Sequence, residues 1–115
     1  MWYFVKGEFV EDNIAGKPFP EVQAFIEQVI HPSLQALEEG MKQGKVLGGL
    51  AAGERAGYFL VDLPNHEEVG KWMRSLPFWG TLKWTVVALQ SPRSAIEQDK
   101  LSFEQARRMM SVPAR

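Results

Sequence analysis

The chain has 115 residues, of which 45% are hydrophobic, and a net charge of -1 from 13 basic and 14 acidic residues. This length suits one domain with a single core, and the balanced charge gives no footprint for nucleic acid or an anionic membrane. The lack of cysteine excludes disulfides, thiolate catalysis and thiolate metal ligands. No long apolar run or leader pattern occurs, so we expect a soluble, cytoplasmic domain that binds neither nucleic acid nor membranes.

The first third of the chain combines a strand pattern with a long helix pattern. Trp2–Val10 is rich in aromatic and β-branched residues and predicts a strand, and Glu11–Pro18 predicts a polar loop. A helix is expected from Pro20, because proline suits a first turn and apolar residues then recur every three or four positions. Pro32 should kink or split this helix near His31, because proline removes a backbone donor and clashes with the preceding turn.

The middle of the chain predicts a β-hairpin. Val46–Ala52 and Tyr58–Leu63 are strand-like, and the residues between them are typical of a turn. Gly48 and Gly49 weaken the first of these strands unless another group must approach its backbone closely.

A second helix and a last strand follow. Asn65 is expected to cap a helix over about His66–Leu76, with Glu68 completing an approximate capping box, and Pro77 ends it. The strand at Thr81–Leu89 is apolar on both sides towards its end, so we expect it in the middle of a sheet that is covered on both faces.

The order strand, helix, strand, strand, helix, strand predicts a ferredoxin-like α+β fold, a four-stranded antiparallel sheet with two helices on one face. We assign residues 1–92 to this domain and residues 93–115 to a C-terminal extension, where Ser102 and Gln105 predict a short helix around Phe103–Met110. The other face of the sheet carries large apolar groups. We therefore expect a homodimer, or a higher homo-oligomer, in which two sheets form an α+β barrel. The alternative cover is the C-terminal tail folded back over that face.

Three segments carry a resemblance to a known family. They are WYFVKGEF from Trp2, GYFLVDL from Gly57 followed by Asn65-His66-Glu67-Glu68, and SLPFWGTLKWTVVAL from Ser75. They resemble the muconolactone isomerase-like family of the dimeric α+β barrel superfamily, which typically has a G-x-F-x-V-D segment, an acidic start to the second helix and an L-P segment before the last strand. The resemblance covers Met1–Pro92 and implies an isomerase that moves a proton on a small lactone from aromatic-compound breakdown. Ala88 stands where many relatives have proline, the tail is longer than in the isomerase, and no catalytic residue of the family is transferred to this chain.

Such an isomerase needs a base near the substrate carbon and a donor for the enolate oxygen. His31 is the candidate base because its ordinary pKa lies near neutrality, and Glu27, four residues earlier, could share its helix face and bind it. The simpler alternatives are a solvent-facing histidine and a solvated carboxylate.

Four aromatic residues are candidates for the lining of an apolar substrate cleft, namely Phe4, Tyr58, Trp79 and Trp84, with ordinary core packing as the alternative. Two histidines without a paired spacing and no cysteine indicate no transition-metal site, and no cofactor-binding motif occurs. The alternative to an isomerase is a non-catalytic dimeric module that binds a small ligand or serves as an accessory protein.

Overall fold

The computed structural model describes residues 1–11 and 14–111. In chain order the elements are β1 (Trp2–Phe9), α1 (Phe19–Phe25), the π-helical segment η2 (Ile26–Ile30), α2 (His31–Lys42), β2 (Val46–Leu50), β3 (Ala56–Asp62), α3 (His66–Ser75), the 3-10 turn η3 (Trp79–Thr81), β4 (Leu82–Ala88) and α4 (Pro92–Ser111).

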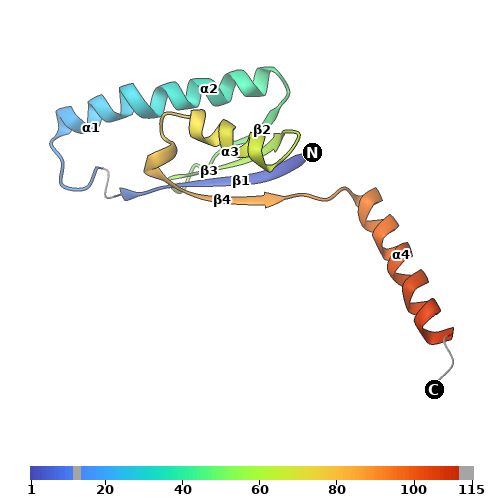
Figure 1. The fold of residues 1–115 in the computed structure, drawn as a ribbon. Coiled ribbons are helices and arrows are strands. Elements are labelled where there is room, and N and C mark those ends of the chain that lie inside the picture. Colours follow the sequence, from blue (N-terminus) through green and yellow to red (C-terminus); the bar gives the residue numbers. More distant parts are fainter. Residues whose placement is uncertain (12–13, 112–115) are drawn as a thin grey trace.

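The four strands form one antiparallel sheet in the order β2-β3-β1-β4. The helices α1, α2 and α3 lie over one face of this sheet (Figure 1). This α+β arrangement is consistent with a ferredoxin-like fold. One expectation is wrong: β4 lies at the edge of the sheet and pairs with β1 alone. Its apolar residues on both sides do not mark a central strand, since Val86 and Val87 are both exposed.

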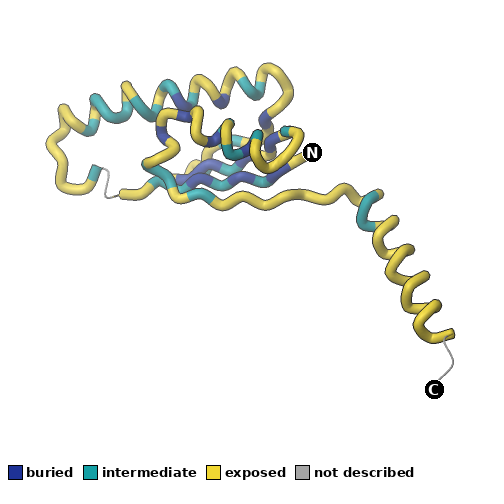
Figure 2. The backbone as a smooth tube through the Cα atoms, in the orientation of Figure 1, coloured by how far each residue is buried: buried dark blue, intermediate teal, exposed yellow. Residues whose placement is uncertain are grey.

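The core lies between the sheet and the helices. Buried residues alternate with more exposed ones along most of β1 and β3 (Figure 2). Successive side chains of a strand point to opposite faces of the sheet, so the buried set faces the helices and the other set faces away from them. The residues of the core are Tyr3, Val5, Leu37, Val46, Phe59, Val61, Val69, Met73, Leu76 and Phe78. The sheet is therefore packed on one face only.

The segments α1, η2 and α2 follow one another without an intervening loop. Pro32 stands in the first turn of α2, directly after η2, and the His31 N–H donates to the Ile26 carbonyl, five residues earlier. The wider π turn moves the preceding backbone away from the proline ring, which would clash with it in a regular α-helix. The predicted interruption near His31 thus takes the form of a π segment.

The β2–β3 hairpin forms as predicted. One of its glycines is required because the backbone of the paired strand lies very close to it. Gly48 has φ 114, and a Cβ placed on it would lie 2.1 Å from the Tyr58 carbonyl oxygen of the paired strand. By contrast, a Cβ on Gly49 would meet nothing within 4 Å. A side chain is therefore excluded at Gly48 by the neighbouring strand, whereas there is space for one at Gly49.

The helix α3 begins as expected, because the Asn65 side chain accepts a hydrogen bond from the Glu68 N–H at 3.0 Å. The C-terminal helix differs from its prediction. It spans 20 residues from Pro92, and its cap is Ser91, whose hydroxyl accepts from the Ser94 N–H at 3.0 Å. Serine followed by proline is a strong start signal, and the pattern at Ser102 lies inside the helix.

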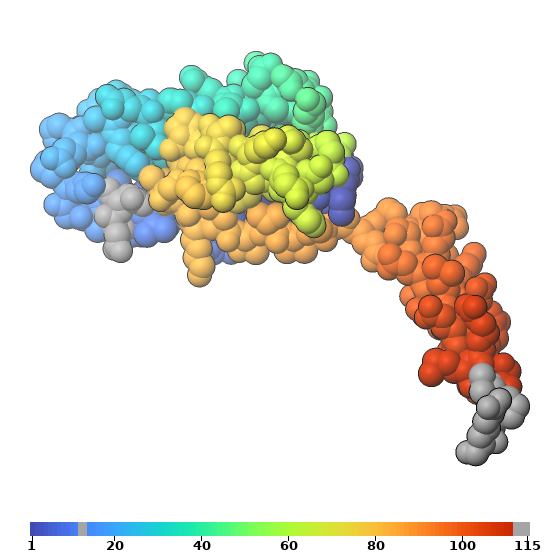
Figure 3. Space-filling model, in the orientation of Figure 1, coloured from blue at the N-terminus to red at the C-terminus, as the bar shows by residue number. Residues whose placement is uncertain are grey.

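Helix α4 extends away from the rest of the molecule, and the Cα atoms span 76 × 32 × 26 Å (Figures 1 and 3). None of its residues is buried. The alternative in which the tail folds back over the sheet is therefore wrong for residues 92–111. The division into residues 1–92 and 93–115 stays a prediction; in the structure α4 begins at Pro92.

The face of the sheet opposite the helices, here called the open face, is rich in apolar side chains. Its apolar residues are Trp2, Phe4, Leu47, Tyr58, Leu60, Val87 and Leu89. Leu47 is 50% exposed and Val87 is 46% exposed. No described segment of the chain covers this face.

A candidate binding cavity between the helical layer and the sheet

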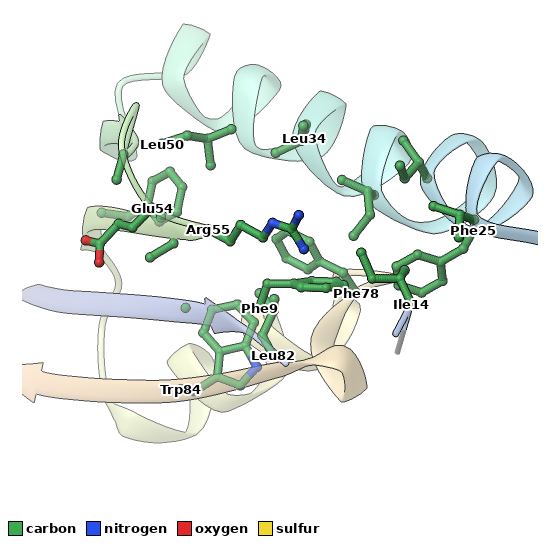
Figure 4. A pocket seen from close by; sticks show the side chains of 18 residues that line it. Phe9, Ile14, Phe25, Leu34, Leu50, Glu54, Arg55, Phe78, Leu82 and Trp84 are labelled. Atoms are coloured by element: carbon green, nitrogen blue, oxygen red, sulfur yellow. The ribbon is translucent and has the colours of Figure 1, made fainter. Parts of the chain in front are cut away.

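A cavity of about 460 Å³ lies between the α1–α2 layer and the sheet. Its volume falls within the range of about 300–1,000 Å³ that is usual for small-molecule sites. The lining is almost entirely apolar and includes side chains from the helices, the sheet and the loop before β4 (Figure 4). The lining residues are Gly7, Phe9, Ile14, Val22, Phe25, Ile26, Ile30, Leu34, Leu50, Ala51, Glu54, Arg55, Ala56, Gly57, Phe59, Phe78, Leu82 and Trp84.

Aromatic rings make up much of the cavity wall. The Phe9 and Phe25 rings lie 6.0 Å apart at one end, where the end of β1 meets α1. The Phe78 and Trp84 rings meet edge to face at 5.9 Å, and Phe78 is 5% exposed. Rings in such contact hold each other in place, so this part of the wall is formed before any ligand arrives.

Phe78 is also fixed through its backbone. Its N–H donates to the Ser33 hydroxyl at 2.9 Å, and that hydroxyl donates to the Val29 carbonyl at 2.8 Å. The buried Ser33 thus joins the helical layer to the loop before β4. The Trp84 indole N–H donates to the Trp79 carbonyl at 2.9 Å, which fixes the second ring of the pair.

Two charged residues line the mouth of the cavity, and both belong to the turn between β2 and β3. In Figure 4 the Arg55 side chain extends across the cavity, whereas the Glu54 carboxylate points away from its centre. The guanidinium of Arg55 pairs with the Glu11 carboxylate at 3.3 Å, and the Arg55 side chain is 59% exposed. Glu54 accepts a hydrogen bond from the Tyr58 hydroxyl. An apolar cavity with a cation across its mouth can hold an apolar molecule that carries a polar or anionic group.

The two residues predicted for catalysis lie outside this lining. His31 begins α2 and is exposed, although its neighbours Ile30 and Leu34 line the cavity. Glu27 is exposed on η2 and accepts a hydrogen bond from the Gln23 side chain at 3.0 Å. No hydrogen bond between Glu27 and His31 occurs among the described residues. Their catalytic roles stay predictions.

The four aromatic residues predicted to line a cleft divide among three places. Trp84 lines the cavity. Phe4 and Tyr58 lie on the open face, with ring centroids 6.4 Å apart. Trp79 is partly exposed beside the loop before β4, and the Arg74 guanidinium stacks on its ring at 5.0 Å. Period two in the strands separates Tyr58 from the cavity, because its neighbours Gly57 and Phe59 take the helix-facing side.

A small network of charged groups surrounds Tyr58 on the open face. Lys6 pairs with Glu8 at 2.6 Å and lies 5.3 Å from the centre of the Tyr58 ring. The hydrogen bond from Lys6 lowers the pKa of Glu8, and the bond to Glu8 raises the pKa of Lys6. The hydrogen bond to the Glu54 carboxylate raises the pKa of Tyr58, because its ionisation would break that bond. This network therefore connects the open face, through Tyr58 and Glu54, to the β2–β3 turn at the mouth of the cavity.

Arg55, Phe78 and the two glycines of the lining were not predicted as site residues. The sequence places Arg55 next to Glu54 in the expected hairpin turn, and nothing in the sequence distinguishes it there from an ordinary exposed residue. The glycine pair is visible only through strand register, which sets Gly7 directly opposite Gly57.

The chain matches no protein-family model and no curated protein. Within residues 1–11 and 14–111, no helix is long and apolar enough to cross a membrane. The same residues bring together no group of three or more histidine, cysteine, aspartate or glutamate side chains that could hold a metal ion.

Proposed function

We propose that this protein binds a small, largely apolar molecule in the cavity between the α1–α2 layer and the sheet. The observation that carries the proposal is the cavity itself, about 460 Å³ of space that is lined by apolar and aromatic side chains and open to solvent at its mouth. A concave, mostly apolar site with a few polar groups at its mouth is typical of small-molecule binding sites. The Phe78 and Trp84 rings hold each other in place by an edge-to-face contact, which supports a site that is already formed before the ligand binds.

The proposal is tested with N-phenylnaphthylamine, a neutral probe that fluoresces when it leaves water. We expect one probe bound per chain, and we expect Leu34→Trp to abolish binding because the indole fills the cavity that Leu34 lines. Gln35→Trp is the matched control, since Gln35 is exposed on the same helix and lies outside the lining. Equal binding by both variants would contradict the proposal.

A second candidate function is that of a muconolactone isomerase-like enzyme, which moves a proton on a small lactone in this cavity. The resemblance of the three sequence segments supports it. So does Arg55, whose guanidinium lies across the cavity and can donate hydrogen bonds to an enolate oxygen. Glu54 is the one carboxylate among the described lining residues, and a rotation of its side chain away from Tyr58 would direct it inwards as a base.

The isomerase is tested by following double-bond migration in muconolactone. If the protein is an enzyme with a carboxylate base at the cavity, Glu54→Gln lowers turnover by about a hundredfold or more. His31→Ala distinguishes the two candidate bases, Glu54 and His31. A loss of turnover of about a hundredfold in His31→Ala would assign the role of the base to His31. Binding of N-phenylnaphthylamine with no turnover of the lactone favours the non-catalytic binding module.

We also infer that two copies pair through their open faces and form the α+β barrel. The support is the row of apolar side chains there, from Leu47 and Leu60 to Val87, which no described segment covers. An apolar face of this kind usually marks an interface, and two-fold pairing is the commonest solution. A groove lined by Trp2, Leu60 and the first turns of α4 continues this face towards the helix.

Sedimentation velocity tests the pairing. We expect a dimer at micromolar concentration, and we expect Leu60→Asp to yield a folded monomer because the charge lies at the centre of the interface. Phe19→Asp is the control, since Phe19 is exposed at the start of α1 in the helical layer, which lies over the other face. A wild-type protein that sediments as a monomer contradicts this assembly.

A further inference from the structure

The floor of the cavity is built on two glycines that face each other. Gly7 of β1 is the direct partner of Gly57 of β3, both are buried, and both belong to the cavity lining. They lie on the helix-facing side of the two central strands, where large side chains would otherwise rise towards the helices. Without side chains at this pair, the sheet leaves space above it within the cavity.

Aromatic rings occupy the space that side chains on these glycines would take. A Cβ on Gly57 would lie 2.5 Å from Cε2 of the Phe59 ring. A Cβ on Gly7 would lie 3.0 Å from Cδ1 of Leu82 and 3.2 Å from Cζ3 of the Trp84 ring. The Phe59 and Trp84 rings thus lie against the glycine backbone instead of standing up from the sheet. They leave the volume above them empty and give the cavity an aromatic floor.

Above this floor the strongest polar group is the Arg55 guanidinium. A guanidinium carries five N–H donors in a planar fork that matches a carboxylate or sulfonate. Its described ionic partner, the Glu11 carboxylate, is exposed and 3.3 Å away, so a ligand anion can exchange with it at little cost. The rest of the lining offers the ligand apolar surface, apart from Glu54.

We infer that the ligand is a flat, ring-bearing organic anion. Its rings stack on the aromatic floor formed by Phe59 and Trp84, and its anionic group binds Arg55 in place of Glu11. This inference rests on the proposed function, because it names the chemical class of the molecule that the cavity takes. A neutral apolar molecule of the same shape binds more weakly.

The anionic part is tested by two probes that differ by one charged group. Anilinonaphthalene sulfonate carries a sulfonate on the ring system of N-phenylnaphthylamine, so their dissociation constants can be compared in the same variants. We expect Arg55→Gln to weaken the sulfonate probe about tenfold or more and to leave the neutral probe nearly unchanged. Glu11→Gln should tighten the sulfonate probe or leave it unchanged, because it removes the competing carboxylate.

The aromatic floor is tested by a pair of glycine substitutions. In Gly57→Ala the new methyl displaces the Phe59 ring upwards into the cavity, so we expect both probes to bind about tenfold or more weakly. Gly49→Ala is the matched control on the neighbouring strand, where a Cβ meets nothing, and both probes should bind as to the wild type. If Gly57→Ala fails to fold, Gly7→Ala replaces it, since its Cβ meets the flexible end of Leu82.

The outcomes separate the two levels of the proposal. If neither probe binds the wild type, or if Leu34→Trp leaves binding intact, the proposed function fails and the ligand class fails with it. If the neutral probe binds but Arg55→Gln weakens both probes equally, the cavity is a binding site and the anionic class is wrong. If Gly57→Ala binds like Gly49→Ala, the stacking floor is wrong.

Discussion

Replacing Ser33 by alanine tests how the cavity wall is held. The Ser33 side chain is fully buried between α2 and the loop before β4. Its hydroxyl donates to the Val29 carbonyl and accepts from the Phe78 N–H, at 2.8 and 2.9 Å. Alanine removes both bonds and leaves the buried N–H of Phe78 without this acceptor.

The expected loss can be worked from these two bonds. A buried donor that loses its partner costs about 1–3 kcal/mol, and a second hydrogen bond contributes about 1 kcal/mol. We therefore expect Ser33→Ala to lower the free energy of unfolding by about 2–4 kcal/mol. A domain of this size typically has about 5–15 kcal/mol of stability, so the variant still folds.

The assay is urea unfolding followed by tryptophan fluorescence. Ser75→Ala is the control, because the Ser75 hydroxyl also donates to a helix carbonyl, that of Trp72 at 2.6 Å, but at an exposed site. We expect the control to lose less than about 0.5 kcal/mol. A loss in Ser33→Ala no greater than in Ser75→Ala would refute the role assigned to the buried hydroxyl.

Two further predictions concern the sheet. The hydrogen bond from Lys6 lowers the pKa of Glu8, so this carboxylate stabilises the fold above its unfolded value of 4.5 and loses that contribution as the pH falls through the lower folded value. Unfolding free energies measured from neutral to acid pH should fall less steeply in Glu8→Gln than in the wild type, and parallel curves would contradict the ion pair. Gly48→Ala should lower the unfolding midpoint strongly, because its Cβ would lie 2.1 Å from the Tyr58 carbonyl at φ 114, whereas Gly49→Ala should leave it nearly unchanged. Equal midpoints for the two variants would show that the strand relaxes freely at Gly48.

Local signals predicted most of the fold. The cap at Asn65, the turn chemistry of the β2–β3 hairpin and the strand pattern of β1 depend on neighbours in sequence, so these elements lie where they were expected. The position of β4 depends on pairing between distant segments. An apolar pattern on both sides cannot distinguish a central strand from an edge strand with apolar residues on both faces. Helix α4 is longer than predicted, because the prediction rests on the capping pattern at Ser102, whereas the helix starts at Ser91 followed by Pro92.

Most of the cavity lining could not be predicted from the sequence. His31 was singled out for its chemistry, yet it lies on the exposed side of the helix whose Ile30 and Leu34 line the cavity. Only the strand register brings Gly7 opposite Gly57, and only the three-dimensional packing shows rings where their side chains would be. The cavity forms between several segments that are distant in sequence. Its shape therefore cannot be predicted from the pattern of residues within any one of them.

A crystal structure of the protein with N-phenylnaphthylamine tests the central claim most directly. The account predicts density for the probe between α2 and the sheet, with its rings against Phe59 and Trp84 and the Phe78 ring unmoved. Density for the probe on the open face, or a cavity closed by collapse of Leu34 onto the sheet, would contradict it.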